Sequence, residues 1–238
     1  MASIQTLRSQ KKALRSSILA ARKLIPSASV NSQSEHITRS VLQCPEFKES
    51  ESISCYLSMP GEVDTSAIVD EILRQGKKLF VPRTDSPSNS IEMLRIYDGD
   101  DLRSLPSGLW GIREPGPSPL DSGLSLILMP GVAFDRSFCR IGYGKGYYDR
   151  FLSSYSSKHG HVSSLLSYLW FLLAVGLALA ENVLDFNTIP TGSNDWSVHG
   201  IASPAFLADG DTRGESKEND ISGNAQDLTA YCIARRPS

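Results

Sequence analysis

The sequence LSLILMP, residues 124–130, is apolar at nearly every position and is followed by Gly131. A continuous apolar run of this length is typical of a strand that is covered on both faces, as the strands of a parallel sheet are. We therefore expect this stretch to be a central strand of the fold. Ligands of open α/β sheets bind at the carboxyl ends of such strands, so a functional site is expected in the residues that follow.

The chain before this stretch alternates between two kinds of periodicity. Apolar residues recur at helical spacing in three segments: 7–25, 27–44 and 64–76. Three other segments have strand character: SISCYLSM (52–59), KKLFVP (77–82) and IEMLRI (91–96). This alternation predicts an α/β fold in which helices cover a parallel sheet.

Composition and charge limit the class of protein. The chain has 238 residues, of which 40% are hydrophobic and 21% charged, as in ordinary globular proteins. A formal net charge of −2 gives no reason to expect nucleic acid as a partner. The four cysteines lie far apart without a CxxC pair, which argues against structural zinc and a disulfide scaffold. The basic N-terminus lacks the apolar run of a secretory signal, so we expect a cytoplasmic protein, with the mitochondrion as the less favoured alternative.

Two segments affect the domain boundaries. LLSYLWFLLAVGLALA (165–180) is apolar almost throughout but shorter than the about 20 residues that span a bilayer. We interpret it as a buried strand preceded by an apolar insertion near 162–171, or as a buried helix that runs into a strand; a membrane span is less favoured. After residue 201 the chain is polar and loses periodicity. We therefore expect one α/β domain over 1–201 and a disordered polar tail over 202–238.

The segment RIGYGKGYYDRFL (140–152) combines three alternating glycines with several cations. Glycine has no Cβ, so backbone N–H groups can approach a ligand closely. Arg140, Lys145 and Arg150 favour an anion, and a helix that begins near Gly146 would add the partial positive charge of its N-terminus. We therefore expect this loop to bind phosphate.

The spacing of this loop excludes two well-known phosphate-binding motifs. A Walker A loop needs glycine where Cys139 stands and Ser or Thr where Gly146 stands. A dinucleotide-binding fingerprint needs glycine at Tyr147, and we expect no strand directly before Gly142. The alternative is a loop that only turns the chain into a helix.

From about Ser9 to Ile201 the chain resembles the 5-formyltetrahydrofolate cyclo-ligase family. The resemblance rests on KKALR (11–15), YLSMPGEVDT (56–65), LFVPR (79–83), LWGIREP (109–115), LILMPGVAFDRSFCRIGYGKGYYDRFL (126–152), AVGLALAEN (174–182) and IPTGSNDWSVHGI (189–201). It implies a three-layer α/β/α fold with a mostly parallel central sheet. It also implies a ligase of one-carbon metabolism that converts 5-formyltetrahydrofolate to 5,10-methenyltetrahydrofolate, with ATP as co-substrate, Mg²⁺ as cofactor and ADP and phosphate as products.

The resemblance also implies site residues in a monomeric protein whose partners are these small molecules. The implied ATP site comprises Lys11, Lys12, Ala13, Leu14, Arg15, Arg140, Ile141, Gly142, Tyr143, Gly144, Lys145, Gly146, Tyr147 and Tyr148. The implied folate site comprises Leu57, Glu62, Tyr143, Gly144, Lys145, Gly146 and Tyr147. The implied catalytic residues are Lys145, Arg140 and Tyr147, and the implied magnesium ligands are Asp149 and Asp195.

Other interpretations remain open. Several of these residues have structural alternatives: a solvated helix face for Lys11, Lys12 and Arg15, a loop charge for Glu62, and an ion pair with Arg150 for Asp149. His199 stands where the family commonly has Asp, and its closing strand is not recognisable after Ile201; both departures lie near Asp195. The alternative functions are a folate- or ATP-binding protein without turnover and a membrane-tethered protein.

Overall fold

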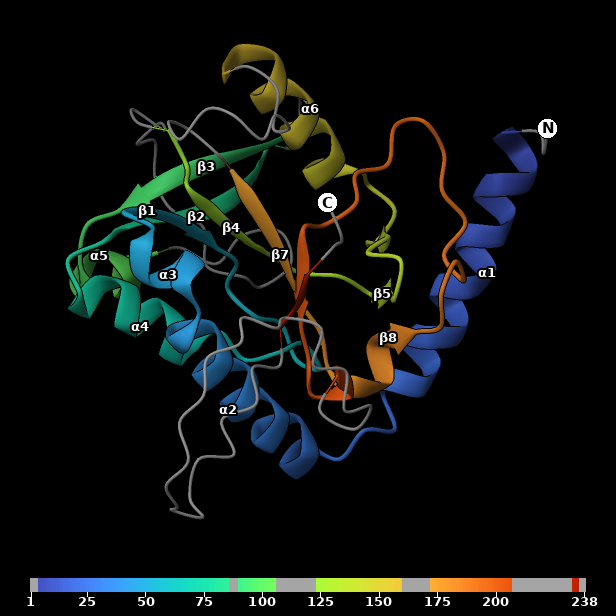
Figure 1. Cartoon of the computed structure of the whole chain (residues 1–238), viewed down its shortest axis with the longest axis horizontal. Coiled ribbons are helices and arrows are strands. Elements are labelled where there is room, and N and C mark those ends of the chain that lie inside the picture. Colours follow the sequence, from blue (N-terminus) through green and yellow to red (C-terminus); the bar gives the residue numbers. More distant parts are fainter. Residues whose placement is uncertain (1–3, 86–89, 106–122, 160–171, 207–232, 236–238) are drawn as a thin grey trace, which may run out of the picture.

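The computed structural model of the chain describes residues 4–85, 90–105, 123–159, 172–206 and 233–235. Within these residues a seven-stranded sheet has the order β10-β9-β7-β4-β1-β2-β3 (Figure 1). Its strands are β1 (Ser52–Cys55), β2 (Lys78–Asp85), β3 (Ser90–Ile96), β4 (Leu126–Met129), β7 (Leu173–Leu177), β9 (Gly200–Ala202) and β10 (Ile233–Arg235). The five strands β9-β7-β4-β1-β2 are parallel, and β3 and β10 are antiparallel to their neighbours at the two edges. The sheet is therefore mostly parallel, as the sequence predicted.

Helices cover both faces of this sheet. The described helices are α1 (Ile4–Arg22), α2 (Ser27–Gln43), α3 (Pro45–Glu49), α4 (Ser66–Arg74), α5 (Gly99–Ser104) and α6 (Tyr147–His159), with the 3-10 turns η1 (Ala180–Asn182) and η2 (Pro204–Phe206). Of these, α2, α3 and α4 lie over one face of the seven-stranded sheet and α6 over the other, whereas α1 packs elsewhere. In β4, Leu126 and Leu128 belong to the core cluster under α2, α3 and α4, whereas Ile127 and Met129 belong to the cluster under α6. Alternate side chains of a strand point to opposite faces, so every position of β4 is apolar because both faces are buried. The result is a three-layer α/β/α arrangement.

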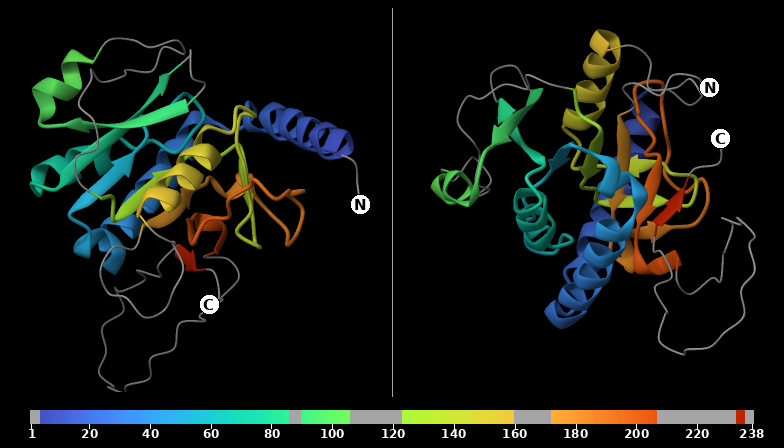
Figure 2. Two further views of the ribbon diagram at one scale, coloured as in Figure 1. Left: turned by 90° about the horizontal axis from the view of Figure 1, so that it is seen from above. Right: turned by 60° about the vertical axis from the view of Figure 1, so that its left-hand side comes forward.

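A smaller sheet lies beside the main one and carries α1. It has the order β6-β5-β8, formed by β5 (Ala133–Asp135), β6 (Arg140–Ile141) and β8 (Val183–Leu184). Ile18 of α1 packs there with Val132, Ala133, Ile141 and Ile189 in a separate buried cluster. In Figure 2 (left), α1, in dark blue, lies next to this sheet at one end of the molecule. This packing fixes the helix that carries Lys11 and Arg15.

The described residues differ from three sequence expectations. The two-residue strand β6 runs directly into Gly142, so the expectation of no strand there was wrong. Within the expected tail over 202–238, Ala202 ends β9, and Ile233–Arg235 form β10, which pairs antiparallel with β9. The strand expected over 52–59 ends at Cys55, because the residues after it turn away to line a pocket.

The apolar stretch over 165–180 is described only in its second part. That part contains β7, a buried strand between β4 and β9, which both interpretations of the stretch required. The expected insertion near 162–171 lies outside the described residues. Among the helices that the structure describes, none is both long and apolar enough to cross a membrane.

Candidate active site

A pocket of about 400 Å³ opens at the carboxyl ends of β1, β2 and β4. Tyr56 and Glu62 follow β1, Thr84 lies at the end of β2, and Pro130 follows β4. From β1 the chain continues through α4 to β2 on one side, whereas β4 continues through α6 to β7 on the other. The pocket thus lies where the strand order reverses, which is the usual ligand site of an open α/β sheet. Its volume is in the range of small-molecule sites.

The glycine loop forms one wall of this pocket. Gly144 and Gly146 have φ angles of +97° and +66°, in the left-handed region that favours glycine. A Cβ on Gly144 would lie 3.2 Å from Cζ of Arg15, whose Nε donates a hydrogen bond of 2.7 Å to the carbonyl oxygen of Gly142. Helix α6 begins at Tyr147, directly after the loop. The loop therefore presents the N-terminus of α6 to the pocket, which is an arrangement that binds anions.

Two ion pairs cross the pocket wall. Nζ of Lys11 lies 2.5 Å from Oδ2 of Asp195, and Nη2 of Arg140 lies 3.1 Å from Oδ2 of Asp149. The remaining oxygen of Asp149 accepts a hydrogen bond of 3.1 Å from the backbone N–H of Trp196. Each of the two carboxylates is therefore paired with one cation. The alternative pairing of Asp149 with Arg150 is not what the structure has.

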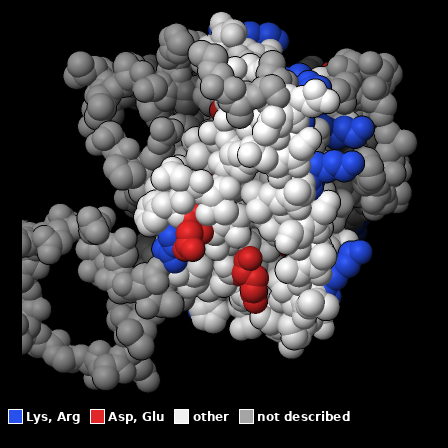
Figure 3. Space-filling view, turned by 90° about the vertical axis from the view of Figure 1, so that its right-hand side faces the viewer, with Lys and Arg blue, Asp and Glu red and all other residues white. Residues whose placement is uncertain are grey.

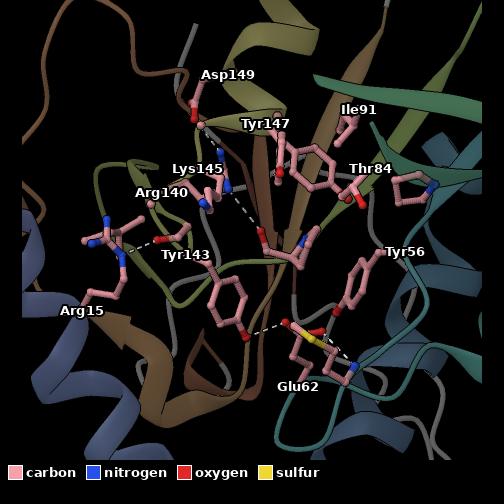
Figure 4. Close-up of a pocket in the computed structure, with 18 of the residues that line it drawn as sticks. Arg15, Tyr56, Glu62, Thr84, Ile91, Arg140, Tyr143, Lys145, Tyr147 and Asp149 are labelled. Atoms are coloured by element: carbon pink, nitrogen blue, oxygen red, sulfur yellow. Dashed lines mark hydrogen bonds and ion pairs between the residues drawn. The ribbon is translucent and has the colours of Figure 1, made fainter. Parts of the chain in front are cut away.

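Lys145 and Arg15 provide positive charge and pair with no carboxylate among the described residues. Both line the pocket, and over the described part of the chain no hydrogen bond or ion pair engages the Lys145 ammonium. Arg140 adds to this charge: its guanidinium lies 5.5 Å from the centre of the Tyr148 ring, and its buried Nε has no hydrogen-bond partner among the described residues. Figure 4 shows Arg15, Arg140 and Lys145 on one side of the pocket. This side suits a polyanion such as a phosphate chain.

The opposite side of the pocket is apolar and contains one buried acid. Tyr56, Thr84 and Ile91 lie there in Figure 4. Glu62 is 7% exposed; its Oε1 accepts a hydrogen bond of 2.8 Å from the Tyr143 hydroxyl, and its Oε2 accepts one of 3.0 Å from the backbone N–H of Met59. Burial raises the pKa of Glu62, although these hydrogen bonds oppose the shift. Burial also raises the pKa of Tyr143 to about 12, so its hydroxyl remains a donor at neutral pH.

Most of the residues expected in the site do line the pocket. They are Lys11, Arg15, Leu57, Glu62, Arg140, Ile141, Gly142, Tyr143, Gly144, Lys145, Gly146, Tyr147, Tyr148, Asp149 and Asp195. Lys12, Ala13 and Leu14 are not among the lining residues: the first two are exposed and Leu14 packs toward the smaller sheet. On the side of the molecule that carries α1, Lys and Arg gather along one edge of the surface (Figure 3). A helix directs only every third or fourth residue to one side, so the run 11–15 divides between pocket and solvent.

Other lining residues were not expected from the sequence. They are Tyr56, Met59, Pro82, Thr84, Ile91 and Pro130. Tyr56 and Pro130 each follow a parallel strand, so the rule that ligands bind at strand ends could have found them. Thr84 and Ile91 come from the antiparallel pair β2 and β3, for which the sequence offers no such signal.

His199 and Trp196, near Asp195, have structural roles. Nδ1 of His199 accepts a hydrogen bond of 3.0 Å from the backbone N–H of Ala174. Nε1 of Trp196 donates one of 2.8 Å to Ser153 of α6. These contacts tie both side chains to neighbouring elements of the fold, and neither residue lines the pocket.

Comparisons with known proteins agree with this geometry. Residues 7–204 match the sequence profile of the 5-formyltetrahydrofolate cyclo-ligase family. A probable 5-formyltetrahydrofolate cyclo-ligase of Caenorhabditis elegans is 38% identical over 169 residues, covering 68% of this chain and 77% of that protein. The 5-formyltetrahydrofolate cyclo-ligase of Mus musculus is 35% identical over 153 residues, which cover 62% and 75% of the two chains.

A solved structure extends the likeness to the fold. The 5,10-methenyltetrahydrofolate synthetase of Aquifex aeolicus superposes with a TM-score of 0.64 at 29% identity, covering 81% of this chain and 89% of that one. The profile match over residues 7–204 runs from α1 to the end of β9. With its profile, its relatives and its fold in agreement, the chain belongs to the 5-formyltetrahydrofolate cyclo-ligase family.

Proposed function

We propose that this chain converts 5-formyltetrahydrofolate to 5,10-methenyltetrahydrofolate at the expense of ATP, and releases ADP and phosphate. The observation that carries the proposal is the division of the pocket into two sides. The side with Lys145, Arg15 and Arg140 suits a triphosphate. The apolar side with Tyr56, Ile91 and the buried Glu62 suits a flat ring system with N–H groups that donate to a carboxylate.

The reaction needs both substrates in one pocket. The formyl oxygen on N5 is amide-like and a poor leaving group, so it first takes the γ-phosphoryl group of ATP, and ADP is released. N10 then attacks the activated formyl carbon and loses its proton; the C–O bond breaks, phosphate leaves and the ring closes. The protein must hold the formyl oxygen in line with the γ-phosphorus and neutralise the charge that develops on the phosphoryl group.

The cations and the glycine loop are suited to this task. The Lys145 ammonium and the Arg140 guanidinium can follow the charge of the transferring phosphoryl group. Backbone N–H groups at Gly144 and Gly146 can approach phosphate oxygens because no Cβ intervenes. Tyr147, which begins α6 and lines the pocket, lies beside this loop and can order the folate against it.

The donor set of the pocket fits Mg²⁺ that arrives with ATP. Asp149 and Asp195 offer carboxylate oxygens, the ligands that this hard cation prefers. Within the described ranges no three His, Cys, Asp or Glu side chains cluster as a metal site, so phosphate oxygens would complete the coordination. Mg²⁺ commonly binds in this way, through one or two carboxylates and the substrate phosphates. Bound there, it would neutralise charge on the phosphate chain.

The test is turnover by the purified chain. With 5-formyltetrahydrofolate, ATP and Mg²⁺, we expect 5,10-methenyltetrahydrofolate, followed by its absorbance, and ADP to form in a one-to-one ratio. Omission of ATP or chelation of Mg²⁺ with EDTA should stop the reaction. If the chain binds both substrates and forms neither product, it is a binding protein of the same fold and the proposal is wrong.

We also propose that the reaction takes place in the cytoplasm. The four cysteines of the chain lie far apart in the sequence, and among the described residues the buried thiol of Cys55 is not part of a disulfide. Proteins of a reducing compartment usually lack disulfides. Fractionation of cells that express the tagged chain tests this, and recovery in mitochondria would contradict it.

A further inference from the structure

Arg22 connects three separate segments of the pocket wall without lining the pocket itself. It lies at the last position of α1, and only 5% of its side chain is exposed. Its Nε donates a hydrogen bond to the carbonyl oxygen of Gly61, and its Nη1 donates one of 3.1 Å to the Tyr143 hydroxyl. Its Nη2 lies 3.8 Å from Oε1 of Glu62. One guanidinium thus joins α1, the loop after β1 and the glycine loop.

The loop after β1 is shaped around this guanidinium. Gly61 has a φ angle of +82°, which side chains rarely adopt. A Cβ at Gly61 would lie 3.3 Å from Nε of Arg22, closer than ordinary van der Waals contact. The neighbouring N–H of Glu62 donates to the carbonyl oxygen of Met59 at 3.0 Å, which closes the turn. The backbone conformation of Gly61 and its close contact with Arg22 therefore both hold the guanidinium in one position.

We propose that Arg22 is a positioning residue for the folate side of the pocket, which acts through Glu62 and Tyr143. The inference rests on the proposed function, because it assumes that the ligand of this side is the folate. Arg22 would fix the direction of the Glu62 carboxylate by holding the Tyr143 hydroxyl that donates to it. It would also keep that carboxylate ionised in a buried place.

The groups around Glu62 explain how Arg22 would keep this carboxylate ionised. Among the described residues, the titratable or charged groups that interact electrostatically with it are Arg22 from α1, Tyr143 from the glycine loop, Tyr56 from the segment after β1 and Tyr148 from α6. Of these, Arg22 is the cation, and it lowers the pKa of Glu62 against the effect of burial. An ionised carboxylate accepts two N–H groups of a ligand, whereas a protonated one has a donor of its own. Loss of Arg22 should therefore weaken folate binding most between the pKa of Glu62 in the parent chain and the higher pKa that Glu62 has without this cation.

The experiment measures the binding of 5-formyltetrahydrofolate by calorimetry, without ATP, across pH 5–9. Arg22→Met keeps the length of the side chain and removes the charge, and we expect it to raise the Kd at least tenfold at neutral pH. The midpoint of the pH dependence should also move upward, because the pKa of Glu62 rises when its cation is lost. Arg22→Lys should restore the midpoint and only part of the affinity. Lys23→Met is the matched control, since Lys23 is the exposed neighbouring cation, and it should change neither value.

A second comparison separates positioning from a general role in folding. In a Glu62→Gln background, Arg22→Met should not move the pH dependence, and it should cost much less affinity than in the parent chain. In turnover, Arg22→Met should raise the KM for 5-formyltetrahydrofolate and change the KM for ATP less than twofold. If Arg22→Met does not fold, Arg22→Lys replaces it in the KM and affinity comparisons, because that variant also loses the forked contact; its pH midpoint should stay at the parent value.

The inference fails if both KM values rise together, if the pH midpoint of Arg22→Met does not move, or if the loss of affinity is the same in the Glu62→Gln background. These failures differ from failure of the proposed function. A parent chain that binds 5-formyltetrahydrofolate with the expected dependence on Arg22 but makes no product would overturn the reaction and leave the role of Arg22 standing. A parent chain with normal turnover and no dependence on Arg22 would overturn the role of Arg22 and leave the reaction standing.

Discussion

Lys145→Ala is expected to lower kcat at least about a hundredfold and to leave the fold intact. The side chain lines the pocket between Gly144 and Gly146, and in the part of the chain that the structure describes its ammonium has no hydrogen bond or ion pair. Its removal therefore breaks no hydrogen bond or ion pair of the ammonium among the described residues. We expect the free energy of unfolding to change by less than about 0.5 kcal/mol, as for most substitutions at such positions.

The magnitude follows from the charge that the reaction develops. A unit charge about 4 Å from a phosphoryl oxygen interacts by about 4 kcal/mol at an effective dielectric constant of about 20. Part of this energy is already present with bound ATP, and only the part gained in the transition state raises the rate. A loss of about 3 kcal/mol corresponds to a factor of about 100 to 1,000, the range typical of one preorganised electrostatic contact.

The assay compares kcat at saturating substrates for the parent chain, Lys145→Ala and Lys158→Ala. Lys158 is exposed near the far end of α6 and outside the pocket, so its loss should leave kcat unchanged. Binding of 5-formyltetrahydrofolate without ATP should stay within about threefold for both variants, because the lost charge acts on the phosphoryl group. A kcat of Lys145→Ala within a few-fold of the parent would refute the reasoning. So would an equal loss in Lys158→Ala.

Glu62→Gln should raise the KM for 5-formyltetrahydrofolate more than the KM for ATP, and an equal rise in both would remove Glu62 from the folate side. Asp135→Ala should lower the free energy of unfolding in chemical denaturation by about 3–5 kcal/mol. Its carboxylate is 0% exposed and accepts hydrogen bonds of 3.0 Å from the N–H groups of Ser137, Cys139 and Ile189. A loss below about 1 kcal/mol would show that these N–H groups find other partners. Stability should also depend on pH through Glu62. Because burial raises its pKa above the ordinary 4.5, the folded chain binds the extra proton. Its contribution to stability is therefore full below pH 4.5 and is lost as the pH rises through the raised pKa. Glu62→Gln should remove that slope, and denaturation curves with the same slope in both chains would contradict the assignment.

The sequence predicted the parts of the fold whose signal is local. The apolar run over 124–130 identifies β4 because a strand buried on both faces needs an apolar residue at each position. The alternating glycines predict the loop before α6, since Gly144 and Gly146 adopt conformations that other residues avoid. Both features are determined by neighbouring residues, so a single sequence suffices to find them.

The parts that were missed depend on contacts between distant residues. β10 pairs with β9, although a segment outside the described residues separates the two strands in the sequence. A strand of three residues is too short to show a periodicity from which it could be predicted. Arg22 follows an apolar stretch of its helix, and its partners Gly61 and Tyr143 lie 39 and 121 residues away along the chain. The sequence predicted the residue types at the site, but not which cation meets which carboxylate.

The first helix shows how these distant parts are aligned. A helix turns about 100° per residue, so Lys11, Arg15, Ile18 and Arg22 share one side of α1. Ile18 anchors that side in the buried cluster of the smaller sheet. The three cations then meet three different segments: Lys11 pairs with Asp195, Arg15 donates to the glycine loop, and Arg22 donates to Gly61. A rigid helix fixes the spacing between its cations. A shift of α1 would therefore move its contacts with Asp195, the glycine loop and Gly61 together, so one helix sets the relative positions of three segments around the pocket.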